Sequence, residues 1–281
     1  MGRMRSPVRW LYASGVAAFL MAAVGCSAVG ERAQVKAGTD PEPVLIYDLT
    51  DGTPQNRRSL ELLYHAQHED LTADCLTAQG DEYEPNPFVH HDPSFGIRAL
   101  FPDGLVSAEN ERRRSQAWRD WQDAGFGGSE CSLAASQAPL PLAADHVAIE
   151  GELPDGLEGR LNEAYVSSPE LVALNADYLA CMTARGFDIE SRGEIGDLII
   201  GEARPESHFD LRPGTDQFDR SIWAADFECF APIQGQMIEL MADIDKPFLD
   251  QNRAVFDRLA AQWDTIDAAA NEIRAQNIYD E

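Results

Sequence analysis

The stretch FDRLAAQWDTIDAAANEI, residues 256–273, decides the fold class of this chain. Its apolar residues recur at alternating steps of three and four, which places them on one face of a helix: Phe256, Leu259, Trp263, Ile266, Ala270 and Ile273. Such a face needs an apolar surface to cover it. Because the repeat spans fewer than four heptads and Ala270 weakens it, we expect this face to pack on the protein's own core, with an intermolecular coiled coil as the alternative.

The segment before this stretch is also helix-like, from Gln234 to Asp243. Asp245 and Pro247 follow it and either begin a new helix or mark a kink. We therefore predict a long C-terminal helix and a mainly α protein.

Two similar strings of sequence, CLTAQG (residues 75–80) and CMTARG (residues 181–186), each end an apolar helical pattern at a glycine. Glycine is typical of the left-handed residue that terminates a helix. Thr53-Pro54 and Ser168-Pro169 have the composition of the two corresponding helix starts.

The helices are separated by long stretches rich in proline and glycine. Residues 44–138 are predicted to form a first helical lobe with a disulfide, which includes a Pro-rich loop from Tyr83 to Gly104 and a segment that starts at Ser107. Residues 139–159 resemble a linker in their content of proline and glycine, and residues 160–281 are predicted to form a second disulfide lobe with the long C-terminal helix.

The N-terminus has the features of an export signal. Arg3, Arg5 and Arg9 precede an apolar run, and small residues close it before Cys26. The run is too short to cross a bilayer comfortably as a permanent helix, for which about 20 residues are needed. Residues 1–25 are therefore predicted to be a cleaved signal peptide.

Ala23-Val24-Gly25-Cys26 resembles the bacterial lipobox, in which the cysteine thiol is acylated and becomes the new N-terminus. The string has Ala23 where leucine is more usual. We expect lipid on Cys26 to anchor the chain at the extracytoplasmic face of the cell membrane, with residues 26–43 as a flexible tether. A signal cut nearby, with release of the protein, and an uncleaved membrane anchor are the alternatives.

The other four cysteines, Cys75, Cys131, Cys181 and Cys229, form an even set in an oxidising compartment. No C-x-x-C or C-x-x-H spacing occurs, so a zinc site or a redox pair has little support, and we predict no metal or cofactor. Four cysteines allow three pairings. The repeated strings favour Cys75 with Cys131 and Cys181 with Cys229, each bond stabilising the fold by about 2 to 4 kcal/mol.

The chain is strongly acidic, with a formal net charge of −26 at pH 7. Removal of residues 1–25, which contain arginines but no acidic residue, makes the charge more negative still. Nucleic-acid binding is disfavoured because phosphate contacts need a basic surface.

Candidate catalytic residues are few. His90-His91-Asp92 has the composition of a metal or acid/base site, but adjacent histidines in a Pro-flanked loop point in different directions. His65 and His68 lie three residues apart on a predicted helix, where an exposed face is the simpler interpretation than a ligand pair. None of the common hydrolase, zinc-protease or nucleotide-binding motifs occurs. We therefore assign no catalytic residue and do not expect an enzyme.

Several short motifs resemble a group of uncharacterised actinobacterial lipoproteins. They are Asp74 to Gly80 with Tyr83 and Pro85, Phe95-Gly96-Ile97, Cys181-Met182 with Gly186-Phe187, and Ala225 to Cys229 ahead of a long C-terminal helix. This chain differs from the group at Leu76, Asp81 and Phe95. The resemblance implies an accessory role in the cell envelope, with an export transporter or a cell-wall component as partner.

The first functional hypothesis is thus a membrane-anchored, non-enzymatic binding or accessory protein, which predicts an apolar groove near residues 83–101 or a free face on the C-terminal helix. An extracytoplasmic hydrolase with a noncontiguous site is the second, and it predicts carboxylates around His90 or His91. The third is a structural spacer that self-associates through the C-terminal helix.

Overall fold

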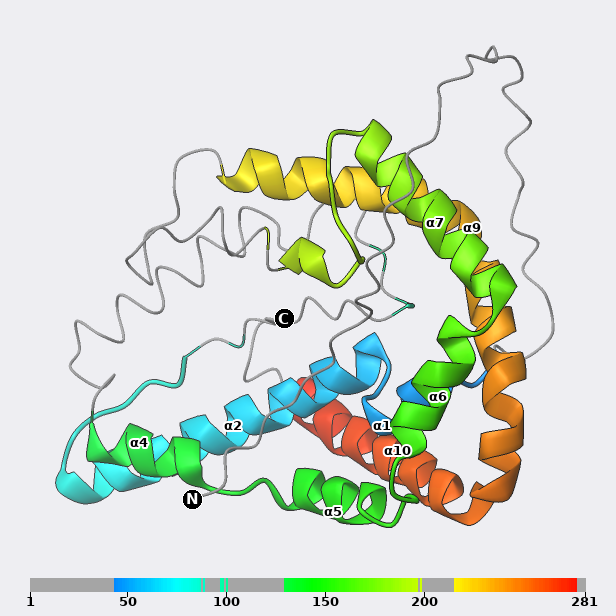
Figure 1. The fold of residues 1–281 in the computed structure, drawn as a ribbon. Coiled ribbons are helices and arrows are strands. Elements are labelled where there is room, and N and C mark those ends of the chain that lie inside the picture. The colour runs from blue at the N-terminus through cyan, green and yellow to red at the C-terminus, as the bar shows by residue number, and fades with distance from the viewer. Residues whose placement is uncertain are drawn as a thin grey trace. The chain divides into compact units, whose positions relative to one another are not determined.

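A computed structural model of the chain describes residues 43–86, 88, 97–98, 100, 129–196, 198 and 215–276 (Figure 1). The predicted signal peptide, Cys26, His90, His91 and the segment that starts at Ser107 lie outside the described residues. Residues 44–281 form one compact unit. Every regular element among the described residues is a helix, which confirms the mainly α fold class.

The helices in chain order are α1 (Ile46–Thr50), α2 (Pro54–Gln79), α4 (Glu130–Gln137), α5 (Pro141–Glu150), α6 (Leu157–Val166), α7 (Pro169–Ala184), α9 (Thr215–Gln251) and α10 (Arg253–Ala275).

The ends of α2 and α7 follow the local rules read from the sequence. The Thr53 hydroxyl accepts a hydrogen bond from the Asn56 N–H, and the Ser168 hydroxyl does the same for Leu171. Pro54 and Pro169 begin the two helices, where a missing N–H has no consequence. Gly80 (φ 91°) and Gly186 (φ 92°) adopt the left-handed conformation just after the helices.

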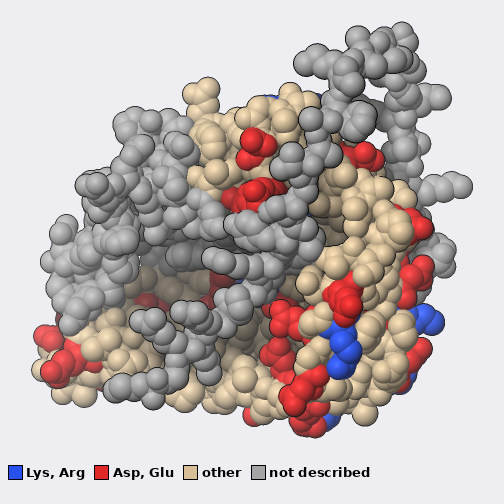
Figure 2. Space-filling model, viewed as in Figure 1, with Lys and Arg blue, Asp and Glu red and all other residues tan. Residues whose placement is uncertain are grey.

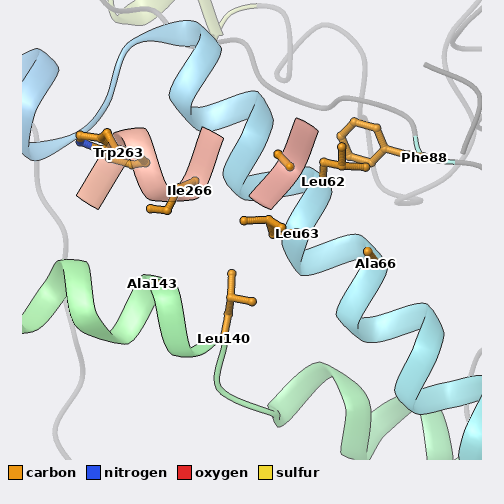
Figure 3. Packing of buried hydrophobic residues seen from close by; sticks show 9 residues of the cluster. Leu62, Leu63, Ala66, Phe88, Leu140, Ala143, Trp263 and Ile266 are labelled. Atoms are coloured by element: carbon orange, nitrogen blue, oxygen red, sulfur yellow. The ribbon is translucent and has the colours of Figure 1, made fainter. Parts of the chain in front are cut away.

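The apolar face of α10 is buried inside the protein itself. Phe256, Leu259, Trp263, Ile266 and Ala270 are all buried, and α10 packs against α2 and α5. Trp263 and Ile266 belong to one cluster with Leu62 and Leu63 of α2, and Figure 3 shows Ile266 next to Leu63, with Leu140 at the start of α5. Burial of each large apolar side chain stabilises the fold by roughly 1.5–3 kcal/mol. The expectation that this face packs on the protein's own core is confirmed.

A second apolar cluster joins α7 to α9. It contains Tyr178 and Met182 from α7, Ile222, Trp223 and Phe230 from α9, and Ile195 from the segment between them. The Cys181–Cys229 disulfide lies at its edge.

Pro247 neither starts nor ends a helix. It lies inside α9, as does Pro232, and Figure 1 shows α9 bent along its length, as expected where proline removes a backbone hydrogen bond. The break falls at Asn252, whose backbone (φ −120°, ψ 25°) leaves the helical region before α10 begins.

Residues 139–159, predicted to be a linker, instead contain α5 and the start of α6. Pro141 occupies the first position of α5, so it starts a helix rather than breaking one. Leu140 and Ala143 are buried in the same cluster as α2 and α10. The division into two lobes stays a prediction, but the contacts of α10 with α2 cross its boundary.

Candidate functional site

Two disulfides tie the helices together in the predicted pairing. Cys75–Cys131 joins α2 to α4, and Cys181–Cys229 joins α7 to α9, with Cα–Cα distances of 5.6 and 5.7 Å. Cys26 is the cysteine of the sequence that belongs to neither pair.

A polar cluster lies beside the first disulfide, around the buried carboxylate of Glu69 on α2. Glu69 is 2% exposed. One carboxylate oxygen, Oε2, accepts hydrogen bonds from the Tyr83 hydroxyl at 2.6 Å and from the Asn86 backbone N–H at 2.7 Å. The other oxygen, Oε1, lies 3.1 Å from Nδ1 of His68. The hydrogen-bond donors around Glu69 thus compensate for its removal from water.

These donors keep Glu69 ionised. Burial by itself raises the pKa of a carboxyl group, but the hydrogen bonds from His68, Tyr83 and the Asn86 backbone outweigh it, and the pKa of Glu69 lies below its ordinary value. The side chain is therefore a buried carboxylate at neutral pH.

His68 connects Glu69 to a serine on the neighbouring helix. Its Nε2 lies 3.3 Å from Oγ of Ser132, the residue that follows Cys131 in α4. The ionised Glu69 carboxylate can only accept hydrogen bonds, so Nδ1 of His68 must carry the hydrogen on that side. In the neutral imidazole Nε2 is then an acceptor, and the Ser132 hydroxyl donates to it. The order of contacts is Glu69, His68, Ser132.

Thr72 has a buried hydroxyl near this chain of contacts. It is fully buried, and its Oγ1 has no hydrogen-bond partner in the part of the chain that the structure describes. Thr72 lies one turn after His68 and one turn before Cys75, and both of those residues contact α4. An unsatisfied buried hydroxyl is unfavourable by about 1–3 kcal/mol, which makes this position notable.

His65 belongs to the same polar cluster. Its Nε2 is 2.9 Å from the Asn86 carbonyl oxygen, and its ring packs on Phe88 at a centroid distance of 5.5 Å. His65 and His68 are thus part-buried with separate partners, and the expectation of an exposed helix face is wrong for them. Chain segments far away in sequence cover this side of α2. Among the described residues, no three His, Cys, Asp or Glu side chains gather as metal ligands would.

A cavity of about 500 Å³ lies near the second disulfide. It is lined by Arg185, Phe187, Ser221, Ala224, Ala225 and Glu228. Arg185 pairs with Glu228, and the Ser221 hydroxyl donates to the Phe218 carbonyl at 2.8 Å. The polar groups of this cavity are therefore engaged with the protein itself, and the candidate site is better placed at His68 and Ser132.

Sequence reasoning singled out His68 but not Glu69 or Ser132. One signal could have found them. The pairing of Cys75 with Cys131 places α2 beside α4. His68, two turns before Cys75, and Ser132, next to Cys131, are therefore candidates for contact. The pair His90 and His91 lies outside the described residues.

The described residues form a disulfide-linked helical unit. In it a buried glutamate, a part-buried histidine and a buried serine follow one another along one hydrogen-bonded chain. Comparison with protein-family models, with curated proteins and with solved structures finds no match to this chain. Among the helices that the structure describes, none has both the length and the apolar character to cross a membrane.

Proposed function

We propose that the chain is an exported lipoprotein that is acylated on Cys26 after removal of residues 1–25, and that it acts as a binding or accessory component at the outer face of the cell membrane. The main support for the proposal is the division of the five cysteines into two disulfides and one remaining residue, Cys26. Four of them lie in two disulfides, which persist in oxidising, extracytoplasmic compartments. Cys26 is left over at the end of a signal-like segment.

The surface charge agrees with such a location. The view in Figure 2 shows Asp and Glu side chains spread over the described surface, with few Lys and Arg side chains among them. An acidic surface is repelled by anionic lipid head groups, so a covalent lipid and a tether of residues 26–43 suit this protein better than a basic membrane-binding patch. The same charge disfavours nucleic acid as a partner.

An envelope transporter or a cell-wall component is the partner class that the resemblance to actinobacterial lipoproteins supports. Self-association as a spacer has less support, because α10 buries its apolar face against α2 and α5. The same burial removes the C-terminal helix face as a docking surface for the partner.

The anchor is tested by expressing the full-length chain in an actinobacterial host and fractionating the cells. We expect the wild-type protein in the membrane fraction, with an acylated N-terminal peptide at Cys26 by mass spectrometry. Cys26→Ser should abolish the acyl mass and shift the protein out of that fraction. Ala23→Leu, which brings the string closer to the usual lipobox, should raise the processed fraction. A Cys26→Ser protein that was processed and still stayed quantitatively membrane-bound would overturn the anchor.

The accessory role is tested separately by crosslinking on intact cells, followed by purification of the tagged protein from membranes. Recovery of one transporter or wall component with the wild type, and its loss with Cys26→Ser, is the expected result. Recovery of no such component would count against the role and leave the anchor unaffected.

A further inference from the structure

We propose that Ser132 is an activated nucleophile that reacts with small carboxylic esters, with His68 as its general base and Glu69 as the residue that positions His68. The proposal adds a chemical activity to the binding or accessory role above, and it does not depend on the lipid anchor.

The first support is the geometry of the three side chains. A nucleophilic serine needs a base within hydrogen-bond reach and a third group that orients the base. Ser132 Oγ lies 3.3 Å from His68 Nε2, and His68 Nδ1 lies 3.1 Å from Glu69 Oε1. The first distance is long for a hydrogen bond, as is common before substrate tightens such a site.

The second support is that the acid is fixed and charged. Tyr83 and the Asn86 backbone hold the far oxygen of Glu69, so the near oxygen faces His68 in one orientation. A buried carboxylate in this position stabilises the imidazolium that forms when His68 takes the serine proton. Its charge is retained at neutral pH, as the hydrogen bonds around it require.

The third support is the surroundings of Ser132. The residue lies in the first turn of the eight-residue helix α4, near the end of the helix that carries partial positive charge. The Ser132 N–H itself donates to the Ser129 hydroxyl, so the helix end favours negative charge on a bound carbonyl oxygen through its partial positive charge alone. The Thr72 hydroxyl, one turn after His68 on α2, is buried and has no hydrogen-bond partner among the described residues.

The small exposed area of Ser132 limits its substrate to a small molecule. Ser132 is 6% exposed, whereas the side chain of His68 keeps 24% of its surface in solvent. Because little of Ser132 is exposed, a compact ester suits the site better than a long acyl chain or a folded protein. Short-chain acyl esters are therefore the substrate class.

The reaction balances with water as the one co-reactant. Ser132 Oγ bonds to the ester carbonyl carbon while its proton passes to His68 Nε2. The tetrahedral intermediate then expels the alkoxide, which takes that proton and leaves as the alcohol. Water then gives a proton to His68 Nε2 as its oxygen bonds to the acyl carbon. The bond from that carbon to Ser132 Oγ breaks, the carboxylic acid leaves, and the proton passes from His68 to Ser132 Oγ.

The test uses the full-length protein purified in detergent and treated with diisopropyl fluorophosphate, a small reagent that phosphorylates activated serines with loss of fluoride. We expect one adduct, on the peptide that contains Ser132, and turnover of p-nitrophenyl acetate. Ser132→Ala should lose both. Ser136→Ala is the matched control: Ser136 lies one turn later in α4, its hydroxyl donates to the Leu133 carbonyl, and this variant should keep both.

A variant of His68 distinguishes an activated serine from a serine that is only accessible to the reagent. His68→Gln should slow labelling at least about 100-fold, in line with the loss of a general base. No adduct at Ser132 in the folded protein, or equal labelling of the wild type and a folded His68→Gln variant, would overturn the proposal. Cys26→Ser should keep full labelling, so failure of the anchor and failure of the nucleophile remain distinguishable.

Discussion

Arg192 donates two hydrogen bonds to the completely buried carboxylate of Asp226, from Nε to Oδ1 at 2.8 Å and from Nη2 to Oδ2 at 2.7 Å. Tyr178 of α7 donates a third, at 2.8 Å to Oδ1. The Arg192 guanidinium also lies 3.9 Å from the centre of the Phe230 ring. This centre ties the segment after α7 to α9 at the apolar cluster.

Removal of Arg192 should be strongly destabilising because it leaves the buried Asp226 charge without its cation. We expect Arg192→Ala to lower the free energy of unfolding by about 3–5 kcal/mol, measured by urea denaturation. The matched control is Arg253→Ala, which removes an arginine whose pair with Asp250 is exposed and should change stability by less than about 1 kcal/mol. Equal effects of the two substitutions would show that burial does not decide the strength of these pairs.

The two disulfides should each contribute substantially to stability. They close loops with sequence separations of 56 and 48 residues, so Cys75→Ser/Cys131→Ser and Cys181→Ser/Cys229→Ser should each lower the free energy of unfolding by about 2–5 kcal/mol. Urea denaturation measures these changes. The reduced wild type, which lacks both cross-links, is compared with the oxidised protein in the same way. If reduction left the wild-type midpoint unchanged, the cross-links would not constrain the unfolded chain as argued.

Gly52 should tolerate a side chain far less well than Gly80. Both have positive φ, at 82° and 91°. A Cβ on Gly52 would lie 2.8 Å from the Trp263 ring, whereas a Cβ on Gly80 would meet nothing within 4 Å. Gly80→Ala should be destabilising by about 1–2 kcal/mol through backbone strain alone.

Gly52→Ala adds to this strain a clash of about 1–3 kcal/mol, because the Trp263 indole is held by a hydrogen bond to the Leu49 carbonyl. Thermal unfolding of the two variants, followed by near-UV circular dichroism, measures the difference. Identical midpoints would contradict the close packing of Trp263 against the turn between α1 and α2.

Asp245 and Glu69 should affect the pH dependence of stability in opposite directions. Burial is the main cause that raises the pKa of Asp245, with a smaller contribution from Asp48, and the hydrogen bonds from Tyr165 and the Ile46 N–H oppose it only in part. The folded protein therefore holds this proton more tightly than the unfolded chain does. Its contribution to stability is complete below the ordinary pKa of 3.8 and is lost as the pH rises from there through the higher folded-state value.

For Glu69 the folded-state pKa is the lower one, so its contribution is present above the ordinary value of 4.5 and is lost as the pH falls through the folded-state value. We expect the stability of the wild type relative to Asp245→Asn to decrease with rising pH. Relative to Glu69→Gln it should increase. Urea denaturation of the three proteins across the acidic pH range gives both stability differences as functions of pH. If both differences changed in the same direction with pH, the opposite pKa shifts of Asp245 and Glu69 would be contradicted.

The sequence predicted the features that depend on neighbours within a few residues. Thr53, Pro54 and Gly80 delimit α2 because capping and backbone preferences act within one turn of a helix. Pro141 shows where this reasoning failed. Proline suits both a linker and the first position of a helix, and the burial of Leu140 and Ala143 decided between them.

By itself, the sequence determined that the chain is mainly helical and where α2 and α7 begin and end, because helix periodicity and caps are written in short stretches of residues. The repeated strings favoured one cysteine pairing, which the structure confirms. Tertiary structure alone decided that the α10 face is covered by α2 and α5. It also decided that Glu69 is buried beneath Tyr83 and Asn86, and that His68 meets Ser132 across 64 residues of sequence. Such contacts depend on how the apolar faces pack together, and no local pattern of residues encodes that choice.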